Sequence, residues 1–145
     1  MVLIESINAE ETLPIRQSVL RPGHPKKECV FDGDDAAQTF HLGAFTDKKL
    51  VGIASFLVDP HTYFSGKQYR LRGMAVLPEY RGKGYGKKLV AYGEKVIQEK
   101  EFDILWFNAR EIAFNFYNRL GFISEGEPFE IPTVGKHLVM FKKLF

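Results

Sequence analysis

The sequence predicts an α/β fold (α+β in the stricter classification) in a single domain. Short runs with the period-two alternation of strands recur along the 145 residues, and helical patterns separate several of them. A glycine-rich stretch, YRGKGYGKKL, joins one strand to the longest helical pattern. No repeat, low-complexity run or linker divides the chain. We therefore expect one domain over residues 1–145, with a mixed central sheet of about six to seven strands flanked by helices.

The N-terminal part of the chain predicts strands, one helix and a long loop. Residues 9–20 have a helical pattern that Pro14 is expected to interrupt, because proline lacks the backbone donor and clashes with the preceding turn. Residues 21–38 contain two prolines, two glycines and an acidic cluster, and an irregular segment of 18 residues favours a functional role. Strands are predicted at residues 2–7, 39–45 and 48–59.

The C-terminal part predicts three more strands and two helices. The strands are expected at residues 68–77, 103–107 and 136–145. The first helix follows the glycines, and its apolar face is expected to consist of Tyr85, Leu89, Tyr92, Val96 and Ile97. The second helix covers residues 110–122 and is closed by Gly121, which suits a left-handed conformation. The polar residues 124–135 are predicted to form an excursion between the final strands.

The order of these elements also predicts a ligand site. A strand, a loop, a helix and a second strand over residues 68–107 are most simply a parallel pair with a right-handed crossover. The loop from Pro78 to Gly86 then lies at the carboxyl end of the first strand, and Asn108 lies at the carboxyl end of the second. Ligands bind at this edge in open α/β sheets.

The glycine-rich loop has the composition of a phosphate-binding loop. Its glycines are Gly82, Gly84 and Gly86, and its cations are Arg81, Lys83, Lys87 and Lys88. Such glycines let backbone N–H groups point into one concavity, next to the partial positive charge of a helix N-terminus. The spacing excludes a P-loop, because Arg81 stands where its first glycine should be, and the Rossmann pattern, because Lys87 replaces its third glycine. The alternative is a glycine-rich turn with solvated lysines.

Two segments resemble the GNAT superfamily of acetyl-CoA-dependent N-acetyltransferases. In VLPEYRGKGYGKKL, the positions of that superfamily's coenzyme A loop are occupied by Arg81, Gly84 and Gly86. WFNAREIAFNFYNRLGF is similar to its second half, with matches at Asn108, Tyr117, Gly121 and Phe122. The two motifs span residues 74–122, about a third of the chain. The N-terminal region, which selects the acceptor in such enzymes, matches less distinctly.

The resemblance implies a fold in which strands four and five form a splayed parallel pair. Acetyl-CoA is the expected cosubstrate, with its pantetheine arm between these strands, and a primary amine would attack its thioester directly, with no metal and no covalent enzyme intermediate. Gly73 would permit the bulge that splays the strands, and a backbone N–H of residues 74–76 would stabilise the oxyanion. The residues expected to bind the coenzyme are Met74, Ala75, Val76, Arg81, Gly82, Lys83, Gly84, Tyr85, Gly86, Lys87, Asn108, Ala113 and Phe116.

The catalytic residues are expected in the second motif and on the last strand. Tyr117 would be the general acid, and the alternative is a buried core tyrosine. Asn108 would contact the pantetheine arm, cap the following helix, or do both. Many relatives carry a glutamate on the fourth strand as general base, whereas this strand offers Arg70 and Arg72. The remaining candidates are Glu79, Glu111, His41 and His137, and His137 is preferred.

The acceptor and the activity remain open at this point. Arg72, beside Met74 on one strand face, is either an exposed strand charge or a site for an acidic group of the acceptor. The acceptor is an amine of unspecified class, either a small molecule or a peptide. The alternative function is a non-catalytic acyl-CoA-binding or regulatory module of the same fold. The resemblance also leaves a homodimer open.

Composition and charge argue against other classes of protein. A net charge of +2, from 20 basic and 18 acidic residues, is too small for a nucleic-acid-binding surface. No apolar run approaches the length of a membrane span, and the N-terminal residues lack the pattern of a secretory signal. The single cysteine, Cys29, excludes an internal disulfide and fits a reducing compartment. We therefore expect a cytoplasmic protein that binds neither nucleic acid nor membranes.

Overall fold

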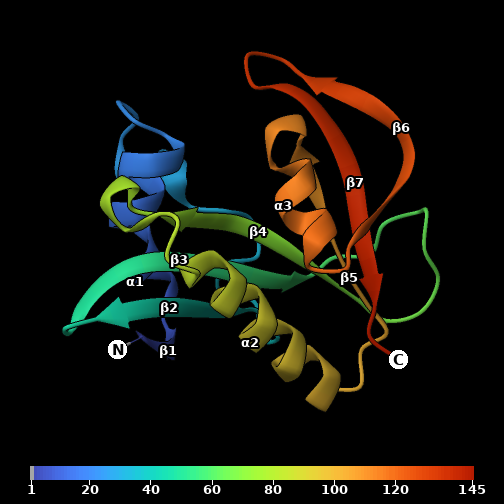
Figure 1. Cartoon of the computed structure of the whole chain (residues 1–145), viewed down its shortest axis with the longest axis horizontal. Helices are drawn as coiled ribbons and strands as arrows, with labels where there is room; N and C mark the ends of the chain where they lie inside the picture. The colour runs from blue at the N-terminus through green and yellow to red at the C-terminus, as the bar shows by residue number, and fades with distance from the viewer. Residues whose placement is uncertain (1) are drawn as a thin grey trace. The chain divides into compact units, whose positions relative to one another are not determined.

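The computed structural model describes residues 2–145, whose strands form a seven-stranded mixed sheet in the order β1-β2-β3-β4-β5-β7-β6 (Figure 1). The strands are β1 (Val2–Ile7), β2 (Phe40–Thr46), β3 (Lys49–Val58), β4 (Gln68–Val76), β5 (Ile104–Arg110), β6 (Ile123–Ile131) and β7 (Gly135–Lys143). The helices are α1 (Ala9–Ile15), the π-helix η1 (Arg16–Leu20), α2 (Tyr85–Glu99), α3 (Phe114–Arg119) and the 3₁₀-helices η2 (Lys26–Cys29), η3 (Pro78–Tyr80) and η4 (Glu111–Ala113). The predicted fold class is confirmed.

The chain divides into two compact units. The N-terminal unit comprises residues 2–58 and 71–96, and the C-terminal unit comprises residues 59–70 and 97–145. The boundary crosses β4 after Arg70 and crosses α2 after Val96.

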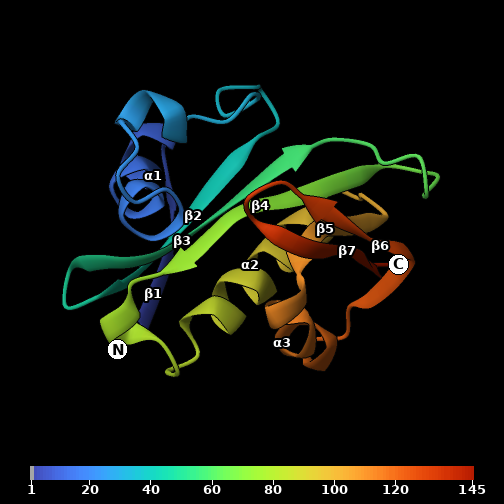
Figure 2. The same cartoon turned by 90° about the horizontal axis from the view of Figure 1, so that it is seen from above.

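In the N-terminal unit, α1 and α2 cover opposite faces of the antiparallel strands (Figure 2). Successive residues of a strand point to opposite faces, and β3 follows this rule. Ile53 packs in one apolar cluster with Ile15 of α1. Phe56 faces α2, where its ring lies so close to Gly93 that a Cβ at this position would collide with it. Burial on both faces explains why β3 is apolar almost throughout.

In the C-terminal unit, β5 is likewise covered on both faces. Phe107 contacts the rings of Tyr117 and Phe122, which lie in and just after α3. On the other face, Trp106 packs edge-on against His61, with 4.8 Å between the ring centroids. The indole nitrogen of Trp106 also donates to the carbonyl of Asp59 at 2.7 Å. The segment before β4 therefore covers the face of β5 that α3 leaves open.

The parallel pairing of β4 with β5 is short. Its register joins Gln68 to Ile104, Tyr69 to Leu105 and Arg70 to Trp106. Both strands continue beyond these pairs, β4 to Val76 and β5 to Arg110. The predicted parallel pair is therefore confirmed. Gly73, where a bulge is predicted, has a positive φ of +66°.

The helix predicted at residues 9–20 changes character close to Pro14, as expected: α1 includes Pro14 but ends at Ile15, and the π-helix η1 follows from Arg16. The N–H of Arg16 is shared between the carbonyls of Thr12 and Leu13. One prediction for the helix after the glycines is wrong. Tyr92 does not belong to the apolar face of α2, since it is 43% exposed.

In the C-terminal unit, residues 124–135 are not an excursion. They lie largely in β6, an edge strand that pairs antiparallel with β7 and has an irregularity between Glu125 and Phe129. β6 lies at the edge of the sheet, next to one strand, and its outward side chains are polar. This polarity conceals the alternation by which a strand is predicted from sequence. The second helix also starts later than predicted: β5 extends to Arg110, η4 follows, and α3 begins at Phe114. Gly121 does adopt the predicted positive φ, +97°.

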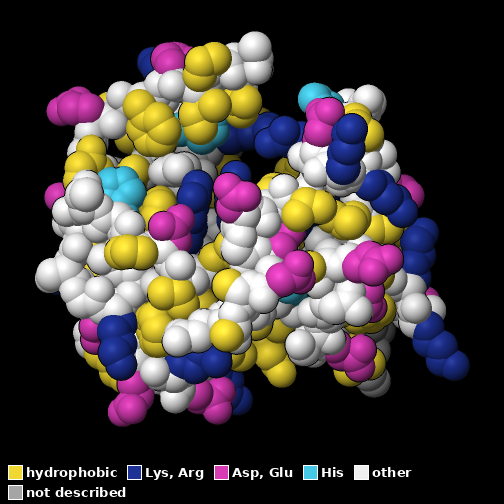
Figure 3. Space-filling model, turned by 180° about the vertical axis from the view of Figure 1, so that it is seen from behind, with side chains coloured by type: hydrophobic (Ala, Val, Ile, Leu, Met, Phe, Trp, Pro, Cys, Tyr) yellow, Lys and Arg dark blue, Asp and Glu magenta, His cyan; other side chains and the backbone are white. Residues whose placement is uncertain are grey.

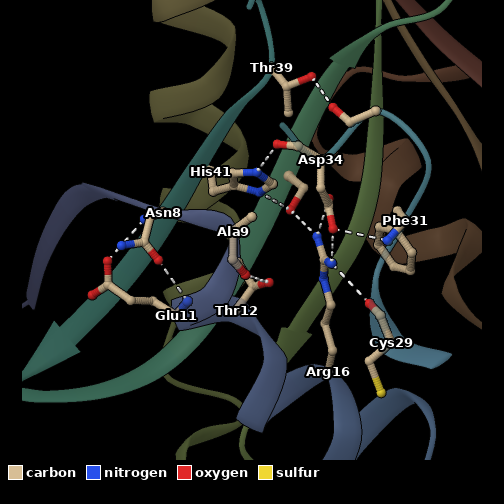
Figure 4. A network of polar contacts seen from close by, with 12 residues as sticks. Asn8, Ala9, Glu11, Thr12, Arg16, Cys29, Phe31, Asp34, Thr39 and His41 are labelled. Carbon is tan, nitrogen blue, oxygen red and sulfur yellow. Dashed lines mark hydrogen bonds and ion pairs between the residues drawn. The ribbon is translucent and has the colours of Figure 1, made fainter. Parts of the chain in front are cut away.

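A buried ion pair organises the segment between η1 and β2. Arg16 is completely buried, and its guanidinium donates two hydrogen bonds to the carboxylate of Asp34, at 2.7 and 2.9 Å (Figure 4). The same guanidinium donates to the carbonyl of Cys29 at 3.0 Å and to Ser55 Oγ in β3 at 2.9 Å. The imidazole of His41 donates from Nε2 to the carbonyl of Asp34, at 3.0 Å, because a carbonyl can only accept. The long loop predicted at residues 21–38 is thus held by one buried charge.

Loss of the Asp34 carboxylate should therefore destabilise the protein strongly. In the variant Asp34→Asn, the buried guanidinium of Arg16 loses its counter-charge, so we expect the free energy of unfolding at pH 7 to fall by about 3–5 kcal/mol. Asp35→Asn, an exposed neighbour, is the matched control and should change stability little. Urea denaturation followed by circular dichroism measures both values, and equal stability of the two variants would contradict the role of the pair.

The pH dependence of stability provides a second test. Burial alone would raise the pKa of Asp34, but the hydrogen bonds from Arg16 and the Phe31 amide and the charge of Arg16 outweigh it, so the pKa lies below 3.8. A lowered pKa stabilises the folded state above the ordinary pKa, and this contribution is lost as the pH falls through the folded value. Wild-type stability should therefore decline more steeply below about pH 4 than that of Asp34→Asn, in the same denaturation experiment.

Candidate functional site

The glycine loop between η3 and α2 has the backbone conformation predicted for an anion-binding loop. Gly82 and Gly84 adopt φ angles of +76° and +86°, which residues with a Cβ rarely adopt. No heavy atom lies within 4 Å of the position that a Cβ would occupy at either glycine, so the loop is open on this side. Glycine is therefore required at these two positions by the backbone conformation, and not by a lack of space for a side chain.

The amides of this loop are available as donors. Among the residues that the structure describes, the backbone N–H groups of residues 82–87 have no acceptor within the protein. The first helical hydrogen bond of α2 joins the N–H of Lys88 to the carbonyl of Gly84, at 3.1 Å. The first amides of a helix carry partial positive charge, and α2 has 15 residues whose dipoles align behind them. This arrangement suits an anion such as a diphosphate.

Charged side chains surround the same loop. Lys83, Lys87 and Lys88 are exposed, and the ammonium group of Lys83 lies 5.6 Å from the ring centroid of Tyr80. Arg81 turns back toward the strand, where its Nε donates to the carbonyl of Val76 at 3.2 Å. Elsewhere the charges are mixed: on the face drawn in Figure 3, basic and acidic side chains are interspersed.

The end of β4 precedes this loop within the N-terminal unit. Ala75 is buried, while Met74 and Val76 are half-buried. The next residue, Leu77, donates its N–H to the carbonyl of Val51 in β3 at 2.9 Å. The predicted coenzyme residues of the first motif all lie in the N-terminal unit, at the end of β4, in the glycine loop and at the start of α2: Met74, Ala75, Val76, Arg81, Gly82, Lys83, Gly84, Tyr85, Gly86 and Lys87.

The residues of the second motif gather in the C-terminal unit. Tyr117 lies in α3 and is 9% exposed, with its ring 4.3 Å from that of Phe107 and 5.0 Å from that of Phe116, centroid to centroid. Burial raises the pKa of the Tyr117 phenol, which therefore keeps its proton at neutral pH. A protonated phenol can act as a hydrogen-bond donor or as a general acid.

Three other predicted coenzyme residues lie near Tyr117 in sequence. Phe116 is 37% exposed and Ala113 is half-buried. Asn108 is half-buried within β5, where it pairs with Val139 of β7. It does not cap the following helix, because β5 continues past it and the residues before η4 and α3 make no side-chain cap. The cap interpretation of Asn108 is therefore wrong, and its side chain is available for another contact.

One ring nitrogen of His137 is fixed by a hydrogen bond to the backbone. It lies in β7, is 5% exposed, and stacks on Phe129 of β6 with 5.8 Å between ring centroids. Its Nδ1 lies 2.8 Å from the carbonyl of Gly135. A carbonyl accepts only, so Nδ1 carries the proton, and in the neutral ring Nε2 has the free lone pair.

The other candidate bases are less suitable. His41 is buried, and both of its ring nitrogens are engaged, Nδ1 with Ser55 Oγ at 2.7 Å and Nε2 with the carbonyl of Asp34. It therefore belongs to the structural network of Figure 4. Glu79 and Glu111 are exposed side chains in η3 and η4.

The sequence pattern does not reveal an aromatic–cation stack in the N-terminal unit. Phe31 lies under two guanidinium groups, with Arg16 Cζ 3.8 Å and Arg72 Cζ 4.3 Å from its ring centroid. Arg72 is half-buried, so its interpretation as an exposed strand charge is wrong. No local pattern could reveal a stack built from three distant segments.

Two general features of the described residues concern metals and membranes. No group of three or more His, Cys, Asp or Glu side chains within residues 2–145 is placed to hold a metal ion. None of the helices in this range combines the length and the apolar character that crossing a membrane requires.

Comparison with known proteins places this geometry in context. A family model described as the acetyltransferase (GNAT) family matches residues 5–122. YitI of Bacillus subtilis, described as an uncharacterized N-acetyltransferase, is 39% identical over 145 residues, which cover 99% of this chain and 97% of that protein. The aminoglycoside N(6')-acetyltransferase type 1 of Salmonella typhimurium is 34% identical over 79 residues, or 50% of this chain and 54% of that protein. The match to the family model spans both motifs.

A solved structure has the same fold. The crystal structure of an aminoglycoside 6'-N-acetyltransferase complexed with coenzyme A matches with a TM-score of 0.78, over 99% of this chain and 97% of that one. The sequences are 15% identical, so the likeness concerns the fold.

Proposed function

The chain belongs to the GNAT acetyltransferase family, and we propose that it transfers an acetyl group from acetyl-CoA to a primary amine by direct attack on the thioester. The observation that carries this proposal is the row of unpartnered amides at the N-terminus of α2, within residues 82–87. These amides hold the diphosphate of the coenzyme, and Lys83 and Lys87 add charge beside it. We further propose that residues 1–145 form a single N-acetyltransferase domain.

Coenzyme binding is tested by a matched pair of glycine variants. Gly84 and Gly23 both have a φ of +86° and open space where a Cβ would be, so alanine strains each backbone by about 1–2 kcal/mol. We expect Gly84→Ala to weaken coenzyme A binding at least about tenfold, because the amides of the loop are displaced. Gly23→Ala should leave binding unchanged. Isothermal titration calorimetry measures both, and no heat with the wild-type protein would refute the proposed function.

The acyl transfer itself needs an oxyanion donor, an acid and a base. A backbone N–H of residues 74–76 stabilises the oxyanion of the tetrahedral intermediate, a contribution of about 2.7–4 kcal/mol per donor in comparable sites. Tyr117 donates its proton to the departing thiolate of coenzyme A, because burial keeps the phenol protonated at neutral pH. Asn108, Ala113 and Phe116 contact the coenzyme. No metal takes part in this scheme.

Removing the phenol hydroxyl of Tyr117 distinguishes a role in acid catalysis from a role in coenzyme binding. We expect Tyr117→Phe to reduce kcat at least about tenfold, since protonation by a positioned acid contributes at least that much. The ring still packs on Phe107, so the affinity for coenzyme A should stay within about twofold of wild type. Steady-state kinetics with a thiol readout, together with calorimetry, measure both quantities. Unchanged kcat would remove Tyr117 from the mechanism.

His137 is proposed as the general base, acting through Nε2, either directly or through a water. The orientation of its ring by the Gly135 carbonyl supports this role. We expect His137→Gln to lower kcat/KM at least about tenfold and to remove the acidic limb of the pH profile, on which the base must lose its proton. The exposed His24→Gln serves as the control. An acidic limb that persists in His137→Gln assigns the base to another group.

A further inference from the structure

The ring of Phe31 is the part of the long loop, residues 21–38, that reaches β4. Its Cε2 atom lies 2.6 Å from the position that a Cβ of Gly73 would occupy, and its Cζ atom lies 3.1 Å from the same point. The guanidinium carbon of Arg72, the preceding residue of β4, lies 4.3 Å from the ring centroid. All of these residues belong to the N-terminal unit. The ring therefore packs on two successive residues of one strand.

Phe31 is fixed at both its backbone and its ring by the buried ion pair. Its backbone N–H donates to Oδ2 of Asp34 at 2.9 Å, and the same oxygen accepts from Arg16 at 2.7 Å (Figure 4). The guanidinium of Arg16 also lies on the ring, with Cζ 3.8 Å from the ring centroid. Hydrogen bonds to a charged group are stronger than those between neutral groups. The ring therefore has a fixed place beside β4.

Gly73 is the residue of β4 whose conformation this contact restrains. Its φ of +66° lies in the left-handed region, in contrast to the extended conformation of a regular strand. Glycine has the largest choice of backbone conformations, so neighbouring groups must restrict it if it is to keep one of them. The edge of the Phe31 ring provides this restriction, because it occupies the space beside the Cα of Gly73.

The conformation of Gly73 determines how β4 continues. Its φ and ψ angles set the orientation of the next peptide group and hence the course of residues 74–76. The proposed oxyanion donor is a backbone N–H of these residues. Such a donor stabilises a developing charge most when it is already aimed at the position that the oxygen will occupy. A change at Gly73 would therefore misalign the donor without removing it.

A buried donor of Arg16 supports a functional role for this packing. The Nε atom of Arg16 is buried without a hydrogen-bond partner among residues 2–145, and it lies 3.5 Å from the same Cβ position of Gly73. A buried donor without an acceptor lowers stability. Proteins retain such local costs mainly where the geometry serves function. The guanidinium is thus held as a surface for the Phe31 ring, although one of its donors stays unpaired.

We propose that Phe31 is a positioning residue for the acetyl transfer. It holds Gly73 in the left-handed conformation and thereby aims the backbone N–H donor of residues 74–76 at the carbonyl oxygen of the acetyl thioester. This inference rests on the proposed function, since it concerns the oxyanion donor of that same reaction. Phe31 acts through the backbone and takes no part in the chemistry. The ion pair of Arg16 and Asp34 thus supports the acetyl-binding end of β4 through one ring.

Calorimetry with and without the acetyl group tests this role in the absence of an acceptor. Coenzyme A lacks the thioester carbonyl, so the ratio of its Kd to that of acetyl-CoA reports the contact between carbonyl and donor. We expect wild type to bind acetyl-CoA at least about threefold more tightly than coenzyme A, the effect of one neutral hydrogen bond. In Phe31→Leu this ratio should fall to near one. The Kd for coenzyme A should stay within about twofold of wild type, because the glycine loop is unchanged.

Phe40→Leu is the matched control. Phe40 is a half-buried ring of the same unit, and it stacks on Phe56 with 4.8 Å between the ring centroids. The same substitution there removes an aromatic contact away from Gly73, so the affinity ratio should remain that of wild type. A ratio that falls equally in both variants would assign the effect to a general loss of packing and overturn the inference.

Gly73→Ala tests the contact from the strand side, and it provides the answer if Phe31→Leu does not fold. A Cβ at this position meets both the ring and an unfavourable φ, so the affinity ratio should again fall to near one. Circular dichroism shows whether each variant has the native fold. A folded Gly73→Ala protein with the wild-type ratio contradicts the role of this conformation.

Turnover gives a second readout. Release of coenzyme thiol from acetyl-CoA is followed with an aminoglycoside, a polyamine and a tripeptide as acceptors. For any acceptor that wild type acetylates, Phe31→Leu should lower kcat at least about tenfold, because the oxyanion donor is misaligned. The KM for acetyl-CoA should rise by no more than about threefold. An unchanged kcat, or a loss confined to KM, counts against the inference.

The outcomes separate this inference from the proposed function. If coenzyme A binds but wild type shows no preference for acetyl-CoA, the inference fails and coenzyme binding stands. The same conclusion follows if the preference survives in Phe31→Leu. If coenzyme A does not bind to wild type, the proposed function fails, and the inference fails with it.

Discussion

The bidentate hydrogen bonding between Arg16 and Asp34 is the interaction on which the N-terminal unit depends. Burying a guanidinium costs several kcal/mol unless a counter-charge and further acceptors compensate it. Here the carboxylate, the Cys29 carbonyl and Ser55 Oγ provide this compensation. As a result, the irregular loop at residues 21–38 is fixed to β3 at one position. A hydrophobic contact of similar size would hold the loop less specifically, because it has no directional partners.

The two halves of the proposed chemistry use different parts of the chain. The N-terminal unit contributes mainly backbone: the amides of residues 82–87 and the end of β4. The C-terminal unit contributes side chains, with Tyr117 and His137 each held by aromatic packing. Backbone donors tolerate sequence change as long as the glycines stay, whereas side-chain donors require particular residues. This difference explains why the glycine motif is recognisable in the sequence, while the general base is not.

Much of the fold could be predicted from the sequence, because its signals are local. The alternation in β4, the helical period of α2 and the positive-φ glycines Gly84 and Gly121 all reflect neighbouring residues. The predictions fail where contacts with distant segments of the chain determine the local structure. The polar edge strand β6 owes its pairing to β7. The Arg16–Phe31–Arg72 stack joins three segments and leaves no periodic signal.

Cys29, whose carbonyl accepts from Arg16, is also the chain's one cysteine, and it is fully buried. Thiol reagents reach such a sulfur only when the surrounding loop opens, so its labelling rate in the native state reports the local opening of that loop. The same shielding means that an Ellman-type reagent added to the folded enzyme reads free coenzyme thiol with little background from the protein. The Cys29 thiol thereby reports on the opening of the loop in which it lies.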